Sequence, residues 1–336
     1  MWPRVPFLDG AERSIELLGK RNPMESPFLR EIKKYDRILL AGAGGGYDIY
    51  SGIPLFEYLR KQGKEVWLAS LSFAGLKGED GLKLRCHYVK VTPETEGDDD
   101  YFPERYLSEW YRDQGEEIPV YCYYGAGART LLNIFQRLQK HLGFEALVLV
   151  DGGTDSLMRG DEPSLGSPAE DVASICAASM LEGVDTYLVN LGFGVDYHHE
   201  VCGVYVLEAV ADLTKTGDYL GSFSLQKGMP EFDTFCDVVE YSCLKSPDRS
   251  SIVATSILSA GQGEFGDYHF TERTAGKELF INPLMSLYWC FRLKGVAERC
   301  LYLDYIKDTH SRMDVHRALA NYLYVAKPRE WKSFPH

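Results

Sequence analysis

Residues 37–48, Arg-Ile-Leu-Leu-Ala-Gly-Ala-Gly-Gly-Gly-Tyr-Asp, decide the fold class of this chain. The apolar run Arg37–Ala41 is short and ends directly in glycines, which is typical of a strand buried on both faces of a parallel sheet. A segment with apolar residues at helical spacing follows over 49–62, and Gly63 marks its end. A buried strand, a glycine turn and a helix in this order predict a β-α unit.

The same order recurs along the chain. Further strands are predicted at Glu65–Leu71, Leu84–Val91, Pro119–Tyr124, Ala146–Val150 and Tyr187–Leu191. Helices are predicted at Pro103–Gln114, Arg129–Leu142, Ser167–Leu181 and Glu200–Leu213. Strands that alternate with helices of about a dozen residues favour a mainly parallel sheet flanked by helices. We therefore predict a Rossmann-like α/β fold.

The pattern loosens after Gly221, where the sequence predicts an irregular, helical C-terminal third. Its expected elements are helices at Met229–Leu244, Ile252–Ala260, Leu284–Leu293 and Asp314–Tyr324, and an edge strand at Leu279–Asn282. We predict a helical N-terminal lead-in over residues 1–34 and a single α/β Rossmann-like domain over 35–330.

Charge and cysteine usage limit the partners. The 336 residues include 36 Lys and Arg against 49 Asp and Glu, for a formal charge of -13. This charge argues against nucleic-acid backbones and anionic membranes as partners. No apolar run approaches the about 18 residues of a membrane span, and no signal peptide begins the chain. The eight cysteines form no CxxC pair, so a cytoplasmic protein with a small-molecule ligand is expected, and a homo-oligomer is left open.

Four predicted strands run directly into glycine turns. Because parallel strands end at one edge of the sheet, these turns should meet there and form a ligand site. The predicted ligand-binding or cofactor-binding residues are Gly42, Gly44, Gly45, Gly46, Asp48, Gly125, Gly127, Arg129, Gly152, Gly153 and Gly194. The alternative is that the glycines only allow short turns.

The segment between residues 151 and 171 is rich in carboxylates and bracketed by glycines. Crowded carboxylates suit general acid–base catalysis or Mg²⁺ binding. The predicted catalytic residues are Asp151, Asp155, Asp161, Glu162 and His199, with Asp151 and Asp155 as candidate metal ligands. Arg129 and Arg159 could clamp an anion, or pair structurally with Asp155 or Asp161. Ser167 and Glu170 are predicted to form a helix capping box.

Standard catalytic motifs are absent from the sequence. In the first glycine turn Tyr47 stands where a dinucleotide fingerprint has its third glycine, and no Gly-Lys-Ser/Thr follows as in a phosphate-binding loop. Neither HExxH nor GxSxG occurs. The cofactor is therefore left open, with Mg²⁺ or an NAD-like nucleotide as candidates.

Several segments together resemble the DUF1152 family, which has no assigned reaction. They are GAGGGYDIYSGIPLFEYLR, DGGTDSLMRGDEPSLGSPAED, GDYLGSFSL, GEFGDYHF and INPLMSLYW, and they extend from about residue 35 to 295. The chain differs from the family pattern at 196–200. A fainter likeness, carried by residues 42–44 and 51–56, is to NAD-binding folds of the sirtuin and deoxyhypusine-synthase type. The resemblance to DUF1152 implies a fold and a site without a reaction.

The main hypothesis is a cytoplasmic enzyme that binds an anionic, nucleotide-like small molecule in the glycine turns. Its carboxylates would assist hydrolysis or group transfer, either directly or through Mg²⁺. The alternatives are a non-catalytic regulator that binds the same kind of ligand, and an NAD-using enzyme with a sirtuin-like or deoxyhypusine-synthase-like fold.

Overall fold

The computed structural model describes residues 25–76, 88–276 and 279–334, and its strands form one sheet. The strands are β1 (Arg37–Gly42), β2 (Glu65–Leu71), β3 (Val89–Val91), β4 (Val120–Tyr123), β5 (Ala146–Asp151), β6 (Asp185–Asn190), β7 (Tyr219–Ser224) and β8 (Leu287–Arg292). Their order across the sheet is β3-β4-β2-β1-β5-β6-β8-β7. The five strands from β4 to β6 are parallel, which confirms the predicted α/β class.

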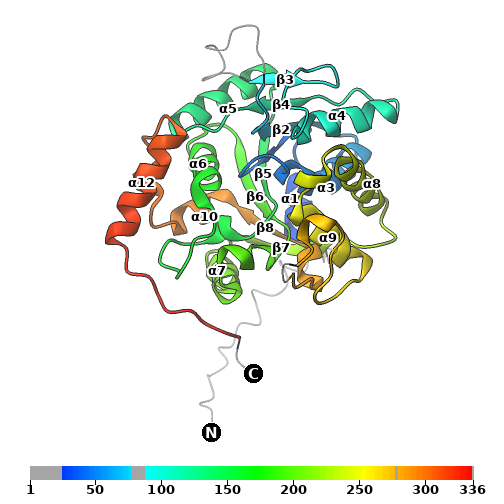
Figure 1. Ribbon diagram of the computed structural model, residues 1–336. Coiled ribbons are helices and arrows are strands. Elements are labelled where there is room, and N and C mark those ends of the chain that lie inside the picture. Colours follow the sequence, from blue (N-terminus) through cyan, green and yellow to red (C-terminus); the bar gives the residue numbers. More distant parts are fainter. Residues whose placement is uncertain (1–24, 77–87, 277–278, 335–336) are drawn as a thin grey trace, which may run out of the picture.

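Helices cover both faces of this sheet, which Figure 1 shows along its edge. One face carries α5 (Ala128–Leu142), α6 (Pro168–Ser179), α7 (Gly203–Thr216) and α10 (Leu293–Arg299). The other carries α1 (Pro27–Ile32), α2 (Asp48–Ser51), α3 (Ile53–Lys61), α4 (Pro103–Asp113), α8 (Pro230–Lys245) and α9 (Ile252–Gln262). The short α11 (Leu303–Ile306) and α12 (Arg312–Val325) lie outside α6. No helix in the described ranges is long and apolar enough to cross a membrane.

The strand order reverses between β1 and β5. From β1 the chain proceeds outward through β2 to β4, and it returns to the other side of β1 to form β5 and β6. The helices that follow β1 pack on one face of the sheet, and α6, which follows β5, packs on the opposite face. The turns after β1 and β5 therefore diverge, and open α/β sheets form their ligand sites at such a reversal.

The C-terminal part corrects two predictions. The predicted helix at Leu284–Leu293 is wrong, because Leu287–Arg292 forms β8, an internal strand antiparallel to β6 and β7. Its side chains alternate between two cores: Trp289 and Phe291 pack on one face and Tyr288 on the other. Because both faces of β8 are apolar, its sequence lacks the alternation of apolar and polar residues that indicates a half-buried strand. The predicted edge strand at Leu279–Asn282 is also wrong, and β7 occupies the edge instead.

Most other predicted elements are confirmed within a few residues. The helix expected over 49–62 is divided at Gly52 into α2 and α3. The strand predicted at Leu84–Val91 is present at Val89–Val91, and residues 84–87 lie outside the described residues. Of the predicted N-terminal lead-in, residues 1–24 lie outside the described ranges, and α1 follows them.

A buried carboxyl group links α4 to the end of β2. Glu104 has no exposed surface, and its two oxygens accept hydrogen bonds from the hydroxyl groups of Ser70 (2.9 Å) and Ser72 (3.1 Å). Burial raises the pKa of Glu104 to about 7, although both hydroxyl groups favour the ionised form. The folded chain therefore holds this proton more tightly than the unfolded chain. The resulting stabilisation is complete below about pH 4.5 and is lost as the pH rises through 7.

We expect Glu104→Gln to stabilise the protein at pH 8 by about 1 kcal/mol, since it removes a buried charge there. The difference in the free energy of unfolding should shrink toward pH 5, where the wild-type carboxyl is protonated. Urea denaturation at the two pH values measures this. The exposed Glu117, changed to Gln, is the control and should show no such pH dependence. A Glu104→Gln protein less stable than wild type at pH 8 would contradict the prediction.

Candidate functional site

The first glycine turn holds an aspartate rather than presenting its amide groups to a ligand. Asp48, the first residue of α2, folds back so that its Oδ2 accepts hydrogen bonds from the backbone N–H of Gly44 (2.7 Å) and Gly45 (3.0 Å). A Cβ atom at Gly44 would lie 2.7 Å from this same Oδ2. Gly44 must therefore be glycine, because a side chain there would displace the carboxylate.

The turn after β5 places a second aspartate opposite the first. Asp151 is the last residue of β5 and is buried. Its Oδ2 accepts hydrogen bonds from Ser156 Oγ and from Asn190 Nδ2, the latter at 2.7 Å. A Cβ atom at Gly152, the next residue, would lie 3.1 Å from Asp48 Oδ1. The two turns at the strand reversal are thus in direct contact.

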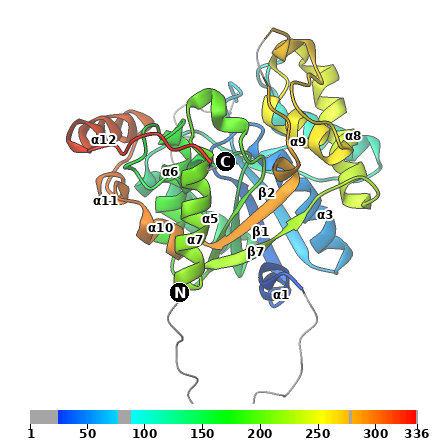
Figure 2. The ribbon, with the colours of Figure 1, turned by 90° about the horizontal axis from the view of Figure 1, so that it is seen from below.

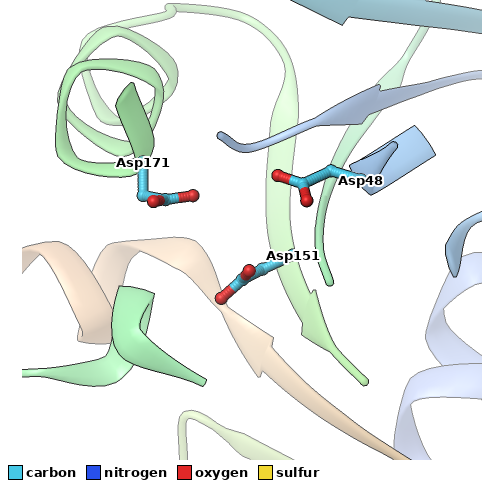
Figure 3. A group of neighbouring side chains, drawn as sticks. All are labelled: Asp48, Asp151 and Asp171. Atoms are coloured by element: carbon cyan, nitrogen blue, oxygen red, sulfur yellow. The ribbon is translucent and has the colours of Figure 1, made fainter. Parts of the chain in front are cut away.

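Asp171, on the first turn of α6, completes a group of three carboxylates. One oxygen of Asp48, one of Asp151 and one of Asp171 lie within 4.8 Å of one another. Figure 3 shows the three side chains directed toward a common space from α2, from the end of β5 and from α6. Asp171 Oδ1 is buried and has no hydrogen-bond partner.

Two further buried aspartates flank this group. Asp155 lies in η3 (Asp155–Leu157), and its Oδ2 accepts a hydrogen bond from the backbone N–H of Ser167 (2.9 Å). Asp196 lies in η4 (Val195–His199), and its Oδ2 accepts one from the backbone N–H of Thr154 (2.6 Å). A Cβ atom at Gly153 would lie 2.7 Å from Asp196 Oδ2, so this glycine leaves room for the carboxylate.

The five aspartates repel one another and are not neutralised by cationic side chains. Burial raises the pKa of Asp48 to about 6, and the amide groups of Gly44 and Gly45 oppose the shift. Burial, and then the nearby charge of Asp155, raises the pKa values of Asp151, Asp171 and Asp196 well above their ordinary range. No salt bridge between described residues includes Asp48, Asp151, Asp155, Asp171 or Asp196.

The chemistry of these donors fits a hard cation. Besides Asp171 Oδ1, the buried Ser51 Oγ and Asn190 Oδ1 have no hydrogen-bond partner. Ser51 lies beside the cluster, since its Oγ is 3.2 Å from a Cβ atom placed at Gly152. Oxygen donors from carboxylates, a hydroxyl and an amide are those that Mg²⁺, Mn²⁺ and Ca²⁺ prefer. A divalent ion would favour the ionised carboxylates and so reverse their raised pKa values.

The rest of the predicted acidic segment lies in a structural network. Asp161 forms salt bridges with Arg159 (2.6 Å) and Arg329 (3.1 Å), which agrees with the predicted structural pair. Glu162 accepts hydrogen bonds from the backbone N–H of Arg159 and of Gly160. Both carboxylates therefore bind groups of their own loop, and both form salt bridges with Arg329 in the segment that follows α12.

The second glycine turn packs against the segment before α12 and not against the aspartates. A Cβ atom at Gly127 would lie 2.4 Å from the carbonyl carbon of Thr309, in the segment before α12. Arg129 forms an exposed salt bridge with Asp308 (2.8 Å). A Cβ atom at Gly125 would contact Arg312 at 3.6 Å. This turn is therefore the docking site of the segment that leads into α12.

The fourth glycine turn opens on an apolar pocket. Gly194 has a left-handed conformation (φ 89°) and precedes η4. It lines a cavity of about 670 Å³, with Phe193 and Leu284 on one side and Trp331 on the C-terminal segment on another. None of the five aspartates lines this cavity.

His199, a predicted catalytic residue, is exposed. Its positive form would lower the pKa of Asp155, but burial raises this pKa by more.

The predicted capping box is wrong. Ser167 precedes α6 and Pro168 begins it, but the Ser167 side chain does not cap the helix. The backbone N–H of Ser167, which would donate to the Glu170 side chain in a capping box, donates to Asp155 instead.

Sequence reasoning did not select Asp171 and Asp196 as site residues. A signal was present for each: Asp171 closes the motif GDE-x-x-LGSP-x-x-D, and Asp196 follows the fourth glycine turn.

Comparison with known proteins identifies one family. A family model described as "Protein of unknown function (DUF1152)" matches residues 105–326, about two thirds of the chain. The match includes Asp151, Asp155, Asp171 and Asp196, whereas Asp48 lies before its start. No curated protein and no solved structure matches the chain, so the sirtuin-like resemblance gains no support.

We expect Asp171→Asn to stabilise the metal-free protein at pH 8 by about 1–2 kcal/mol, since it removes one of several buried like charges. Urea denaturation after treatment with a chelator measures the effect. Asp248→Asn, at an exposed position, is the matched control and should change the free energy of unfolding little. If Asp171→Asn destabilises the metal-free protein, the carboxylate contributes a stabilising interaction and the prediction is wrong.

Proposed function

The chain belongs to the DUF1152 family, and we propose that it is an enzyme that uses a divalent cation to act on an anionic, nucleotide-like small molecule. Asp48, Asp151 and Asp171 would hold the cation at the carboxyl edge of the sheet. The reaction would be hydrolysis or group transfer. The observation that carries this proposal is the meeting of three carboxylates, one with a buried unpartnered oxygen, with which no cationic side chain of the described ranges forms a salt bridge.

The spacing of the three carboxylate oxygens supports a cation-binding site over a site that acts by acid–base catalysis alone. Ligands on opposite sides of Mg²⁺ are about 4 Å apart, given bond lengths of about 2.1 Å. Neighbouring ligands of an octahedral Mg²⁺ are about 3 Å apart, so the three oxygens, which lie within 4.8 Å of one another, would move closer together on binding. Small side-chain adjustments would therefore close the shell, and water and substrate oxygens would complete it.

The glycine turn supports binding of the anion through the metal. The N–H groups of Gly44 and Gly45 donate to Asp48 and so are not available to cradle a phosphate. The turn instead fixes the direction of one metal ligand. An anionic group that enters the site would bind the cation, which supplies the positive charge that the surrounding aspartates lack.

The flanking aspartates supply a proton acceptor. In a hydrolysis, a water oxygen would form a bond to the phosphoryl or acyl centre while the bond to the leaving group breaks. The water proton would pass to a carboxylate. Burial raises the pKa of Asp155 above the ordinary range of an aspartate, which favours the uptake of a proton by this carboxylate. With an alcohol in place of water, the same arrangement would transfer the group.

Calorimetric titration with Mn²⁺ and Mg²⁺ tests the metal site. We expect one ion to bind the wild type, and Asp151→Asn and Asp171→Asn each to weaken binding at least tenfold. Asp161→Asn is the control, because Asp161 is engaged by Arg159 and Arg329 and should not affect metal affinity. The metal site is refuted if neither ion binds the wild type at millimolar concentration.

Product analysis separates an enzyme from a regulator that only binds. The metal-loaded protein is incubated with ATP, AMP, NAD and ADP-ribose, and the mixtures are analysed by mass spectrometry. An enzyme of the proposed kind should convert at least one compound, and Asp151→Asn should abolish the conversion. Metal-dependent binding without any chemical change would favour the regulator.

A further inference from the structure

The second glycine turn brings a cation to the rim of the aspartate site. Thr309, in the segment before α12, accepts a hydrogen bond at its Oγ1 from the N–H of Ala128 (3.0 Å) and one at its carbonyl from the N–H of Arg129 (3.0 Å). Gly127 allows this close approach. Arg312 begins α12 three residues later, so this docking fixes where its side chain starts.

The Arg312 side chain lies beside the α6 turn that carries Asp171. Its Nε is 2.6 Å from Glu170 Oε1, and Glu170 is the immediate neighbour of Asp171. The contact is an ion pair and not a hydrogen bond, since Glu170 Oε1 receives no hydrogen bond from the described residues. Within the described part of the chain, Arg312 donates no hydrogen bond, and its side chain is 55% exposed. The N–H groups that do not face Glu170 are therefore accessible to an anion, which can bind through two of its oxygens.

An exposed aromatic ring stands beside this guanidinium. The Arg312 Cζ atom lies 5.9 Å from the centre of the Phe73 ring, and Phe73 is 47% exposed. A Cβ atom at Gly46, in the first glycine turn, would lie 3.3 Å from Phe73 Cδ2. The ring is thus next to the turn that holds Asp48. Phe73 follows β2 by two residues, so it lies at the same edge of the sheet as the aspartates.

We propose that Arg312 and Phe73 recognise the substrate: Arg312 binds a phosphoryl group of a ligand that also contacts the metal, and Phe73 stacks on its base. This inference rests on the proposed metal-dependent function and names its substrate class, a nucleotide. Glu170 positions the guanidinium by its charge. Because Arg312 lies over the ring of Phe73, which follows β2, one ligand could contact both residues at the rim of the aspartate site.

Arg312 differs from the two other arginines near the glycine turns in its position, since its ion-pair partner Glu170 is the immediate neighbour of Asp171. Arg129 pairs with Asp308 on the surface, and Arg159 pairs with Asp161. Phosphate recognition favours arginine with free, coplanar N–H groups, since two oxygens can then be bound at once. Any nucleobase can stack on an exposed aromatic ring, because stacking does not depend on the hydrogen-bonding groups of the base.

The test measures binding of pyrophosphate and AMP by calorimetry at saturating Mg²⁺. We expect Arg312→Gln to weaken both ligands at least tenfold, and Arg312→Lys to restore binding only in part, because lysine lacks the planar pair of donors. Phe73→Leu should weaken AMP several-fold and leave pyrophosphate unchanged. The affinity for Mg²⁺ should stay within about twofold of wild type in all three variants, and thermal melting checks that each is folded.

Arg129→Gln is the matched control, since it removes an arginine that faces Asp308 on the same docked segment. It should leave binding of both ligands unchanged. Equal losses from Arg312→Gln and Arg129→Gln would overturn the inference, as would wild-type binding by Arg312→Gln. Mg²⁺ binding without pyrophosphate or AMP binding by the wild type would refute this recognition alone. Failure to bind Mg²⁺ would refute the metal-dependent function itself.

Discussion

The gathering of like charges is the constraint on which the site depends. Carboxylates disfavour burial, and close carboxylates disfavour one another, yet four buried aspartates and the partly buried Asp48 gather at the carboxyl edge of this sheet. Amide and hydroxyl donors offset part of the cost: Asp48 receives two N–H groups, and Asp151 receives an amide and a hydroxyl. Asp171 has no such donor for its Oδ1. The proposed cation would be a partner that Asp48, Asp151 and Asp171 share.

The glycines serve this arrangement mainly by leaving space. Gly44, Gly152 and Gly153 each stand where a Cβ atom would press on a carboxylate oxygen. Gly127 leaves space for backbone instead, so a segment from the far end of the chain docks on the same edge. Glycine after a strand is thus compatible with a ligand site and with a docking site, and the residue alone does not distinguish them.

The sequence was sufficient to predict the sheet edge where the candidate site lies, but not every aspartate that the structure brings together there. Strand–glycine–helix units predicted the sheet edge, and Asp151 and Asp155 followed from their place at the end of a strand. Asp171 stands in a sequence motif and Asp196 follows a glycine turn, but the way α6 and η4 turn toward β5 is what separates them from the other acidic residues nearby. Likewise, β8 has apolar residues on both faces, and only its position between β6 and β7 distinguishes it from a helix.

The C-terminal third connects to the site through charge. The segment after α12 runs back toward α7 (Figures 1 and 2), where Arg329 forms salt bridges with Asp161, Glu162 and Glu208. Asp161 and Glu162 lie in the same acidic loop as Asp155, yet arginine side chains match their charges. The same acidic loop therefore contains two kinds of carboxylate. Those matched by arginine hold the C-terminal segment in place, whereas Asp155 forms no salt bridge with any described residue and accepts a hydrogen bond from the backbone of Ser167.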